Sequence, residues 1–384
     1  MNEHNEVINL VSDLVRIDSS NPWLVPGSAG EFEVGNFIAD WLKALGMEVW
    51  LDDVEGDRKN VIAVWRGAGG GRSLCLNAHT DTVGYDLWKY QALQPRIEGD
   101  KLYGLGAADD KGHCAAIMLA AKAVVESKTR LRGDVWVGLT IDEEGTSSGT
   151  MDFVKRYQPD AALVLEPIGL GEITISHQGF GWIDVIVYGK AAHGCVPEIG
   201  IDAIAHMSEV VTRLQRLDRE VFTPNSHPLN GKTVFHTGTI AGGTDYATYP
   251  AECVLGIEIG TQPGETIKNR VREIKEIFAE VREIYPNFKG EVRVKLDRNP
   301  FEAKGYEDLW KVVAAEVERV HGQPAKAVGE NAWGDAALFQ EAGIPTLMFG
   351  AAGANFHAPN EWVSISELTK LVEITAATIQ QFCS

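Results

Sequence analysis

Residues 74–81 read Leu-Cys-Leu-Asn-Ala-His-Thr-Asp, so a short apolar run ends in His79 and Asp81, two residue types that bind divalent metals. The same arrangement recurs further along the chain, with Val135–Ile141 before Asp142, Glu143 and Glu144, and Ala161–Leu165 before Glu166. In an open α/β sheet, ligands bind outside the carboxyl ends of the strands. We therefore expect these side chains to converge on one crevice and to form a metal site.

Strands and helices alternate through the first half of the chain. Residues 31–45 and Gly112–Val125 are predicted helices, and short apolar strands such as Ser73–Ala78 lie between them. This alternation predicts an α/β fold with a mostly parallel central sheet that is covered by helices on both faces. Near the end, the predicted strand Thr346–Phe349 opens a glycine-bearing loop that reaches His357. The loop places His357 at a further strand end.

The order of elements changes near Gly179. The predicted strands from there are Trp182–Tyr188, Thr233–Ile240, Cys253–Ile259 and Glu291–Leu296, and the predicted helices are Ile201–Leu217 and Glu265–Ile284. The order β-α-β-β-α-β is that of a ferredoxin-like unit, a compact α+β domain. Because the α/β alternation resumes after about residue 297, we expect a discontinuous metal-binding domain, residues 1–178 and 297–384, with a second domain inserted at 179–296.

The composition narrows the class of partner. The 384 residues carry a formal net charge of −19, which argues against a membrane surface and against nucleic acid, whose phosphates are bound by Lys and Arg. The five cysteines are widely spaced without a CxxC pair, as expected for reduced thiols in the cytoplasm. The acidic, polar N-terminus does not resemble a signal peptide. No stretch approaches the roughly 18 consecutive apolar residues of a membrane helix.

The residues at the strand ends and in the nearby loops offer nitrogen and oxygen ligands, which zinc accepts. The candidate ligands are His79, Asp109, Glu144, Glu166 and His357. This set suffices for two ions about 3.5–4 Å apart that share one carboxylate, and Asp109 is placed to bridge them. A ligating histidine usually donates its other ring N–H to a carboxylate, a role open to Asp81. Of Glu143 and Glu144, one would bind metal and the other would accept a proton from water.

Each motif alone has a plainer interpretation. The run from Asp109 to Gly112 is also a normal helix N-terminus, where acids suit the helix dipole. Glu143 and Glu144 alone would read as a solvated loop, and Glu166 as the end of a strand. It is their appearance together at successive strand ends that favours the metal site.

With these residues assembled, the chain resembles the co-catalytic zinc peptidase/deacylase family, which includes acetylornithine deacetylase, succinyl-diaminopimelate desuccinylase, carboxypeptidase G and aminoacylase. The resemblance covers almost the whole chain. The motifs that carry it are His79-Thr80-Asp81, GLGAADDKG at 104–112, DEEG at 142–145, Glu166-Pro167, Ala192-His193-Gly194 and HAPNEWV at 357–363. In this order the motifs are highly specific.

The resemblance implies a role for each site residue. One metal would be held by His79, Asp109 and Glu166, and the other by Asp109, Glu144 and His357. Both ions would be zinc, with cobalt or manganese as alternatives. Asp81 would orient His79, and Glu143 would be the general base and proton shuttle. The peptide between Asp109 and Asp110 resembles one that is cis in the family.

The inserted domain resembles the lid and dimerisation module of the family. The resemblance implies a homodimer in which His193 reaches the site of the partner subunit and stabilises the oxyanion. By itself, His193 would be interpreted as a polar residue at a strand end. Its catalytic role therefore depends wholly on the resemblance.

Two positions depart from the family pattern. Gly260 and Ala337 stand where many members carry an arginine, and the asparagine often found near Ala247 is absent. Arginine suits a substrate carboxylate because its planar fork binds both oxygens. Arg298 is one substitute, although its plainer interpretation is a surface charge. The sequence does not say whether a free substrate carboxylate is recognised.

The predicted function is a metal-dependent hydrolase that cleaves an amide or peptide bond of a small substrate, of the N-acyl amino acid deacylase or dipeptidase type. Water activated by two metals would attack the carbonyl while Glu143 accepts its proton. One alternative is a non-catalytic metal-binding or regulatory protein of the same fold. Another is a two-metal phosphoesterase, which the acidic charge and the lack of clustered basic residues near the motifs disfavour.

Overall fold

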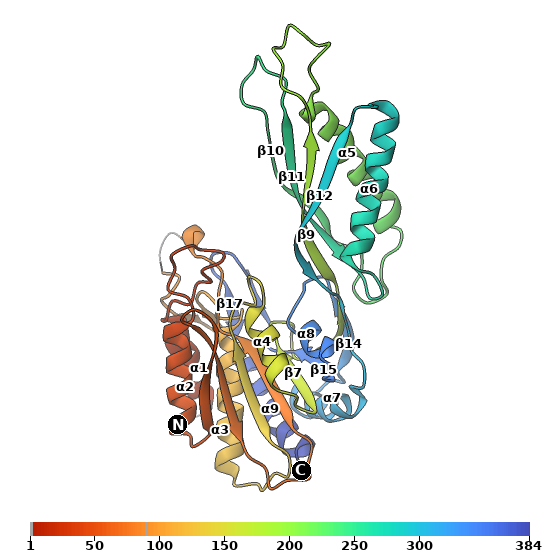
Figure 1. Ribbon diagram of the computed structural model, residues 1–384. Coiled ribbons are helices and arrows are strands. Elements are labelled where there is room, and N and C mark those ends of the chain that lie inside the picture. Colours follow the sequence, from red (N-terminus) through yellow and green to blue (C-terminus); the bar gives the residue numbers. More distant parts are fainter. Residues whose placement is uncertain (1–2, 89–90) are drawn as a thin grey trace. The chain divides into compact units, whose positions relative to one another are not determined.

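The computed structural model describes residues 3–88 and 91–384 and divides the chain into two compact units (Figure 1). The first unit comprises Met1–Ile175, Ala303–Ala327 and Gly334–Ser384, and the second comprises Ser176–Glu302 and Val328–Trp333. The predicted insertion, residues 179–296, lies inside the longer segment of the second unit. Within the described residues, no helix is both long and apolar enough to cross a membrane.

Helices and strands alternate in the first unit as predicted. Its helices are α1 (Glu3–Val15), α2 (Phe32–Ala44), α3 (Lys111–Ser127), α4 (Ser148–Arg156), α7 (Glu307–His321), α8 (Ala336–Glu341) and α9 (Ile365–Phe382). Its longer strands are β1 (Glu48–Glu55), β2 (Arg58–Trp65), β3 (Leu74–His79), β6 (Val135–Thr140), β7 (Ala161–Leu165) and β15 (Thr346–Phe349). Its short strands are β4 (Arg96–Glu98), β5 (Lys101–Tyr103), β16 (Gly353–Ala354) and β17 (Trp362–Ser364). Strands β8 (Glu172–His177) and β14 (Lys326–Glu330) cross the boundary between the units.

The main sheet has the strand order β1-β2-β6-β3-β7-β15-β8-β13, where β13 is Phe301–Glu302, and β14 also pairs with β8. Its central strands β6, β3, β7 and β15 run parallel, while β1, β2 and β8 pair antiparallel with their neighbours. This confirms the predicted mostly parallel sheet. The parallel register pairs His79 with Thr140, so β3 and β6 end at the same level of the sheet. Side chains that follow these strands therefore emerge at one edge.

Alternation along the central strands buries both faces of this sheet. Leu76 of β3 and Val137 of β6 lie in the core that α1, α2, α3 and α9 share. On strand β6 the next residue, Gly138, faces Phe153 of α4, whose ring lies 5.5 Å from that of Phe339 in α8. Helix α3 is alanine-rich and 12 of its 17 residues are buried, because small side chains with high helix propensity allow close packing. Helices thus pack on both faces of the sheet beneath the strand ends.

The second unit is an antiparallel sheet with helices packed against it. Its elements are β9 (Gly179–Tyr188), α5 (Ala203–Leu217), β10 (Phe235–Gly242), β11 (Glu252–Thr261), α6 (Ile267–Ile284), β12 (Lys289–Arg298) and β13 (Phe301–Glu302). The sheet order is β10-β11-β9-β12, and the predicted β-α-β-β-α-β order is confirmed. Alternate residues of β9 and β11, such as Val185 and Leu255, form a core with Met207 and Ile274 of the two helices.

Candidate metal centre

Neighbouring parallel strands of the first unit deliver the candidate residues to one edge of the sheet. β3 ends at His79, the loop after β6 carries Glu143 and Glu144, and β7 ends just before Glu166. β15 opens the loop that leads to His357. The structure brings these side chains together with the loop that carries Asp109 and Asp110, which joins β5 to α3.

His79 is almost fully buried, and acceptors face both of its ring nitrogens. Its Nε2 lies 2.9 Å from Asp109 Oδ1. Its Nδ1 lies 3.0 Å from the Asp81 carbonyl oxygen and 3.4 Å from Asp81 Oδ1. Asp81 therefore holds the side of the ring that faces away from Asp109, as an orienting residue must.

The two oxygens of Asp109 face two different histidines. Oδ1 contacts His79, and Oδ2 lies 3.4 Å from His357 Nε2. The same Nε2 lies 2.9 Å from Glu144 Oε1. The peptide between Asp109 and Asp110 is cis, as the resemblance implied. Asp109 thus stands between two groups of ligand atoms, the position required of a bridging carboxylate.

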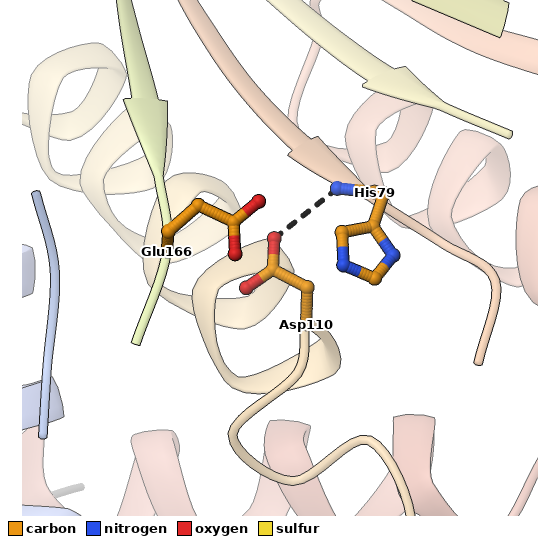
Figure 2. A group of neighbouring side chains, drawn as sticks. All are labelled: His79, Asp110 and Glu166. Atoms are coloured by element: carbon orange, nitrogen blue, oxygen red, sulfur yellow. Dashed lines mark hydrogen bonds between the residues drawn. The ribbon is translucent and has the colours of Figure 1, made fainter. Parts of the chain in front are cut away.

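Asp110 joins the cluster, although we did not predict it from the sequence. One oxygen each of Asp110 and Glu166 and one ring nitrogen of His79 all lie within 4.8 Å of one another. Figure 2 shows the Asp110 carboxylate between Glu166 and His79, where Oδ2 accepts the His79 backbone N–H at 3.1 Å. A second such group consists of His79, Asp109 and Glu144. The only sequence signal for Asp110 was its position beside Asp109.

Asp81 has a second task that the sequence did not indicate. Its Oδ1 accepts the backbone N–H of Glu143, and its Oδ2 accepts that of Glu144, both at 3.1 Å. One carboxylate therefore contacts the His79 ring and also fixes the backbone of both glutamates. The Asp81 side chain thus connects the end of β3 with the glutamate loop that follows β6.

Asp142 anchors the glutamate loop from its other side. It adopts a left-handed conformation with φ of 70°, which Asp tolerates because its short side chain bonds locally. Its Oδ1 accepts hydrogen bonds from Asn21 Nδ2 at 3.0 Å and Arg58 Nη2 at 2.9 Å. Asn21 Nδ2 also donates to Asp81 Oδ2 at 2.7 Å, and Arg58 pairs with the buried Glu31. No local sequence pattern indicates this network, because its members are far apart in the chain.

The buried acids beside His79 are poor anions in this environment. Burial, together with repulsion by Asp110 and other carboxylates, raises the pKa of Glu166 well above its usual range. Burial also raises the pKa of Glu143, with Glu166 adding repulsion and His79 opposing it. Both side chains therefore tend to hold protons while no cation is near.

The histidines respond in the opposite direction. Burial would lower the pKa of His79, but its hydrogen bonds to Asp109 and Asp81 raise it above the ordinary value. Hydrogen bonds to Asp109 and Glu144 raise the pKa of His357 to about 11. Burial would raise the pKa of Asp109, yet the hydrogen bonds with the two histidines hold it below its usual range. The neighbouring carboxylates thus favour the protonated, positively charged form of both imidazoles.

The donor set fits divalent cations. In residues 3–88 and 91–384, the ion pairs of the clustered carboxylates are made with histidines and none with lysine or arginine. These carboxylates are Asp109, Asp110, Glu144 and Glu166. Buried charges in proteins are normally paired or coordinate metals. Oxygen and imidazole ligands at this density suit zinc and also manganese or cobalt.

His193 lies in the second unit and is solvent-exposed. Its Nδ1 accepts the backbone N–H of Cys195 at 3.2 Å. In a neutral ring this places the proton on Nε2, so the outward nitrogen is a hydrogen-bond donor. The local geometry therefore offers a donor to a group outside the loop.

At the two positions that depart from the family pattern, Gly260 and Ala337, neighbouring atoms leave little room for a larger side chain. A Cβ on Gly260 would lie 2.7 Å from Gln178 Oε1, and the Gln178 amide is held by the Val234 N–H and the Lys232 carbonyl. Ala337 is buried in α8. Arg298 is also largely buried and donates to the Asp297 carbonyl, so the surface-charge interpretation is wrong.

Comparison with known proteins gives consistent results. Residues 75–381 match the family described as peptidase family M20/M25/M40. An acetylornithine deacetylase from Proteus mirabilis is 30% identical over 359 residues, which cover 91% of this chain and 89% of the relative. A tripeptidase from Staphylococcus aureus has a TM-score of 0.83 at 21% identity, covering 99% of this chain and 98% of its own. An M20 family metallo-carboxypeptidase from Sulfolobus solfataricus has a TM-score of 0.81 at 16% identity, with 98% and 99% covered.

Proposed function

Because this chain belongs to peptidase family M20/M25/M40, and is therefore a metal-dependent hydrolase of amide or peptide C–N bonds, we propose that it cleaves small N-acyl amino acids or dipeptides with two bound divalent ions. The observation that carries the two-ion proposal is Asp109, whose oxygens face His79 and His357 separately. A carboxylate that turns one oxygen toward each of two histidines can act as the shared ligand of two ions.

Each ion has a proposed set of ligands. His79, Asp109 and Glu166 would hold one ion, and Asp109, Glu144 and His357 would hold the other. Zinc is the proposed metal, with cobalt or manganese as alternatives. When bound, such a pair lowers the pKa of a water molecule and polarises the substrate carbonyl. Asp110 lies close enough to His79 and Glu166 to support the first set.

Glu143 is the proposed general base. It would accept a proton as the water oxygen bonds to the carbonyl carbon, and donate that proton to the nitrogen as the C–N bond breaks. Its buried position raises its pKa, which suits a group that must both take and return a proton. The Glu143 backbone N–H donates to Asp81, and this hydrogen bond fixes the position from which the Glu143 side chain extends. The Asp81 carboxylate also keeps the His79 ring oriented.

His193 is proposed to act in a homodimer formed through the inserted domain. Its Nε2–H would donate to the oxyanion that forms in the site of the partner subunit. The hydrogen bond from the Cys195 amide supports this by leaving the donor nitrogen outward.

A cytoplasmic location also stays a proposal, in keeping with the absence of disulfides among the five cysteines, all of which lie in the described residues.

The substrate is proposed to be recognised without an arginine at position 260 or 337. Gln178 occupies the space in front of Gly260, and Ala337 lies within buried packing. Substrates whose carboxylate is blocked should therefore be turned over about as well as free acids. A strong preference for free acids would show that another cation, such as Arg298, binds the carboxylate.

The test is an unbiased substrate screen. The metal-free and zinc-loaded proteins are offered N-acyl amino acids, their esters and amides, and dipeptides, and release of free amine is measured. We expect turnover only after zinc is added, at two ions per chain by metal analysis. Turnover of a phosphoester, or none of any amide despite two bound ions, would favour the phosphoesterase or the non-catalytic alternative.

A further inference from the structure

Glu361 connects two loops of the first unit that carry proposed ligands. Its side chain is only 1% exposed. Oε1 accepts the backbone N–H of Ala108 at 2.9 Å and of Asp109 at 3.0 Å, and Oε2 accepts that of Gly106 at 3.0 Å. The Glu361 carbonyl oxygen accepts a further bond from the Gly104 N–H at 3.1 Å. Glu361 thus accepts four backbone N–H groups within the segment Gly104–Asp109.

These bonds determine where Asp109 stands. The Asp109 amide is itself one of the donors, so its Cα is held relative to the Glu361 carboxylate. The loop from Gly104 to Asp109 forms no strand or helix of its own, and Glu361 supplies acceptors that regular structure would otherwise provide. Since both Asp109 oxygens face histidines, a small shift of this loop would disturb both at once.

The position of Glu361 is fixed from its own side too. The next residue, Trp362, begins β17 and pairs with Tyr103, which directly precedes the Asp109 loop. His357 lies four residues earlier in the same loop, which is closed by a hydrogen bond from Asn355 Nδ2 to the Asn360 carbonyl at 3.0 Å. Glu361 therefore links Asp109 with the loop that presents His357.

We propose that Glu361 is a positioning residue for the metal pair, which sets the bridging carboxylate and the His357 loop in register without touching either ion. The inference rests on the proposed two-ion function. Residues that orient ligands typically change metal affinity or activity by about 10–100-fold when mutated. Since Asp109 would serve both ions, the loss should appear in both binding steps.

The test compares Glu361→Gln with the wild type as full-length protein. The amide keeps the size of the side chain but turns one acceptor toward the backbone N–H groups into a donor. Zinc is titrated against a competing chelator, and the visible spectrum of the cobalt-loaded protein reports ligand geometry. We expect both zinc dissociation constants to rise by about 10–100-fold and the cobalt spectrum to change.

The matched control is Asp160→Asn. Asp160 Oδ2 also accepts a backbone N–H, that of Ser73 at 2.7 Å, but it lies just before β7, at the opposite end of the strands. Its loss should leave zinc affinity and the cobalt spectrum unchanged. Glu361→Asp provides a second variant with the charge retained and the reach shortened.

The outcomes separate this inference from the proposed function. If the wild type binds fewer than two ions, the two-ion proposal fails first. If the wild type binds two and a folded Glu361 variant binds them equally well, only the role of Glu361 is overturned. Failure of both variants to fold, judged by circular dichroism, would also overturn it, because Glu361 would then be a general folding residue.

Discussion

The two units treat a histidine in opposite ways. In the first unit His79 is 2% exposed, and its ring nitrogens lie 2.9 Å from Asp109 and 3.0 Å from the Asp81 carbonyl. In the second unit His193 is exposed, and its ring Nδ1 accepts the backbone N–H of Cys195 at 3.2 Å. His79 thus has partners for both ring nitrogens within its own unit, whereas His193 presents one ring nitrogen outward. The proposed metal ligands contact one another within one chain. The proposed oxyanion donor, His193 Nε2, faces outward and acts only if another group approaches it.

The strongest test of the first unit is Glu143→Ala. We expect kcat to fall by at least about two orders of magnitude, the usual scale of general acid–base catalysis. Metal content should be retained, because Glu143 is not a proposed ligand. Steady-state kinetics and metal analysis measure both, and Glu33→Ala, an exposed acid of α2, is the control. Near-normal turnover would remove Glu143 from the mechanism.

The second unit is tested by His193→Ala. Loss of one oxyanion donor typically lowers kcat by about 10²–10³-fold. Zinc affinity should stay at the wild-type value. His227→Ala is the matched control, because His227 also accepts local backbone N–H groups in the second unit. Unchanged kcat in the His193 variant would mean that the second unit contributes no catalytic group at this position.

Mixing subunits sharpens the comparison further. His193→Ala and Glu143→Ala protein should regain part of the activity together, because one site of the mixed dimer combines an intact base with an intact donor. The measurement is turnover after subunit exchange, which is verified with differently tagged chains. No recovery despite exchange would place His193 outside a shared site.

A smaller effect is expected for Asn21→Ala. Asn21 donates to both Asp81 and Asp142, so its removal leaves two buried carboxylates each lacking a donor. Such a loss costs about 1–3 kcal/mol in the free energy of unfolding. It should also lower kcat with little change in KM, since the glutamate loop loosens. Chemical denaturation and kinetics check this, with Gln158→Ala at an exposed site as control. An unchanged free energy of unfolding would contradict the bridging role.

The last prediction concerns the pH dependence of zinc binding. The pKa of His357 is raised to about 11, and that of His79 is also raised, so both rings hold protons near neutrality without metal. A metal must displace these protons, and apparent zinc affinity should therefore rise with pH, by about tenfold per unit for each proton released. Calorimetric zinc titrations between pH 6 and 8, in buffers of different ionisation enthalpy, measure this. An affinity independent of pH would show that the rings are neutral before metal binds.

Much of the fold was predictable because periodicity reports local structure. Apolar runs such as Val135–Thr140 match β6 closely, and the β-α-β-β-α-β order of the second unit was confirmed. The short strands β4, β5, β16 and β17 were not predicted, since strands of two or three residues have no readable period. Helix α1 was also not predicted. The antiparallel pairing of β1 and β2 at the sheet edge was not predicted either.

By itself, the sequence determined which residue types stand at the strand ends, because each strand ends locally and a parallel sheet aligns those ends. Only the tertiary structure decided how they are held. Asp110 beside Glu166, Asn21 between two aspartates, and Glu361 on the Asp109 loop depend on contacts between residues far apart in the chain. Such contacts leave no local pattern, since a buried polar group needs a partner in space and its sequence separation is arbitrary.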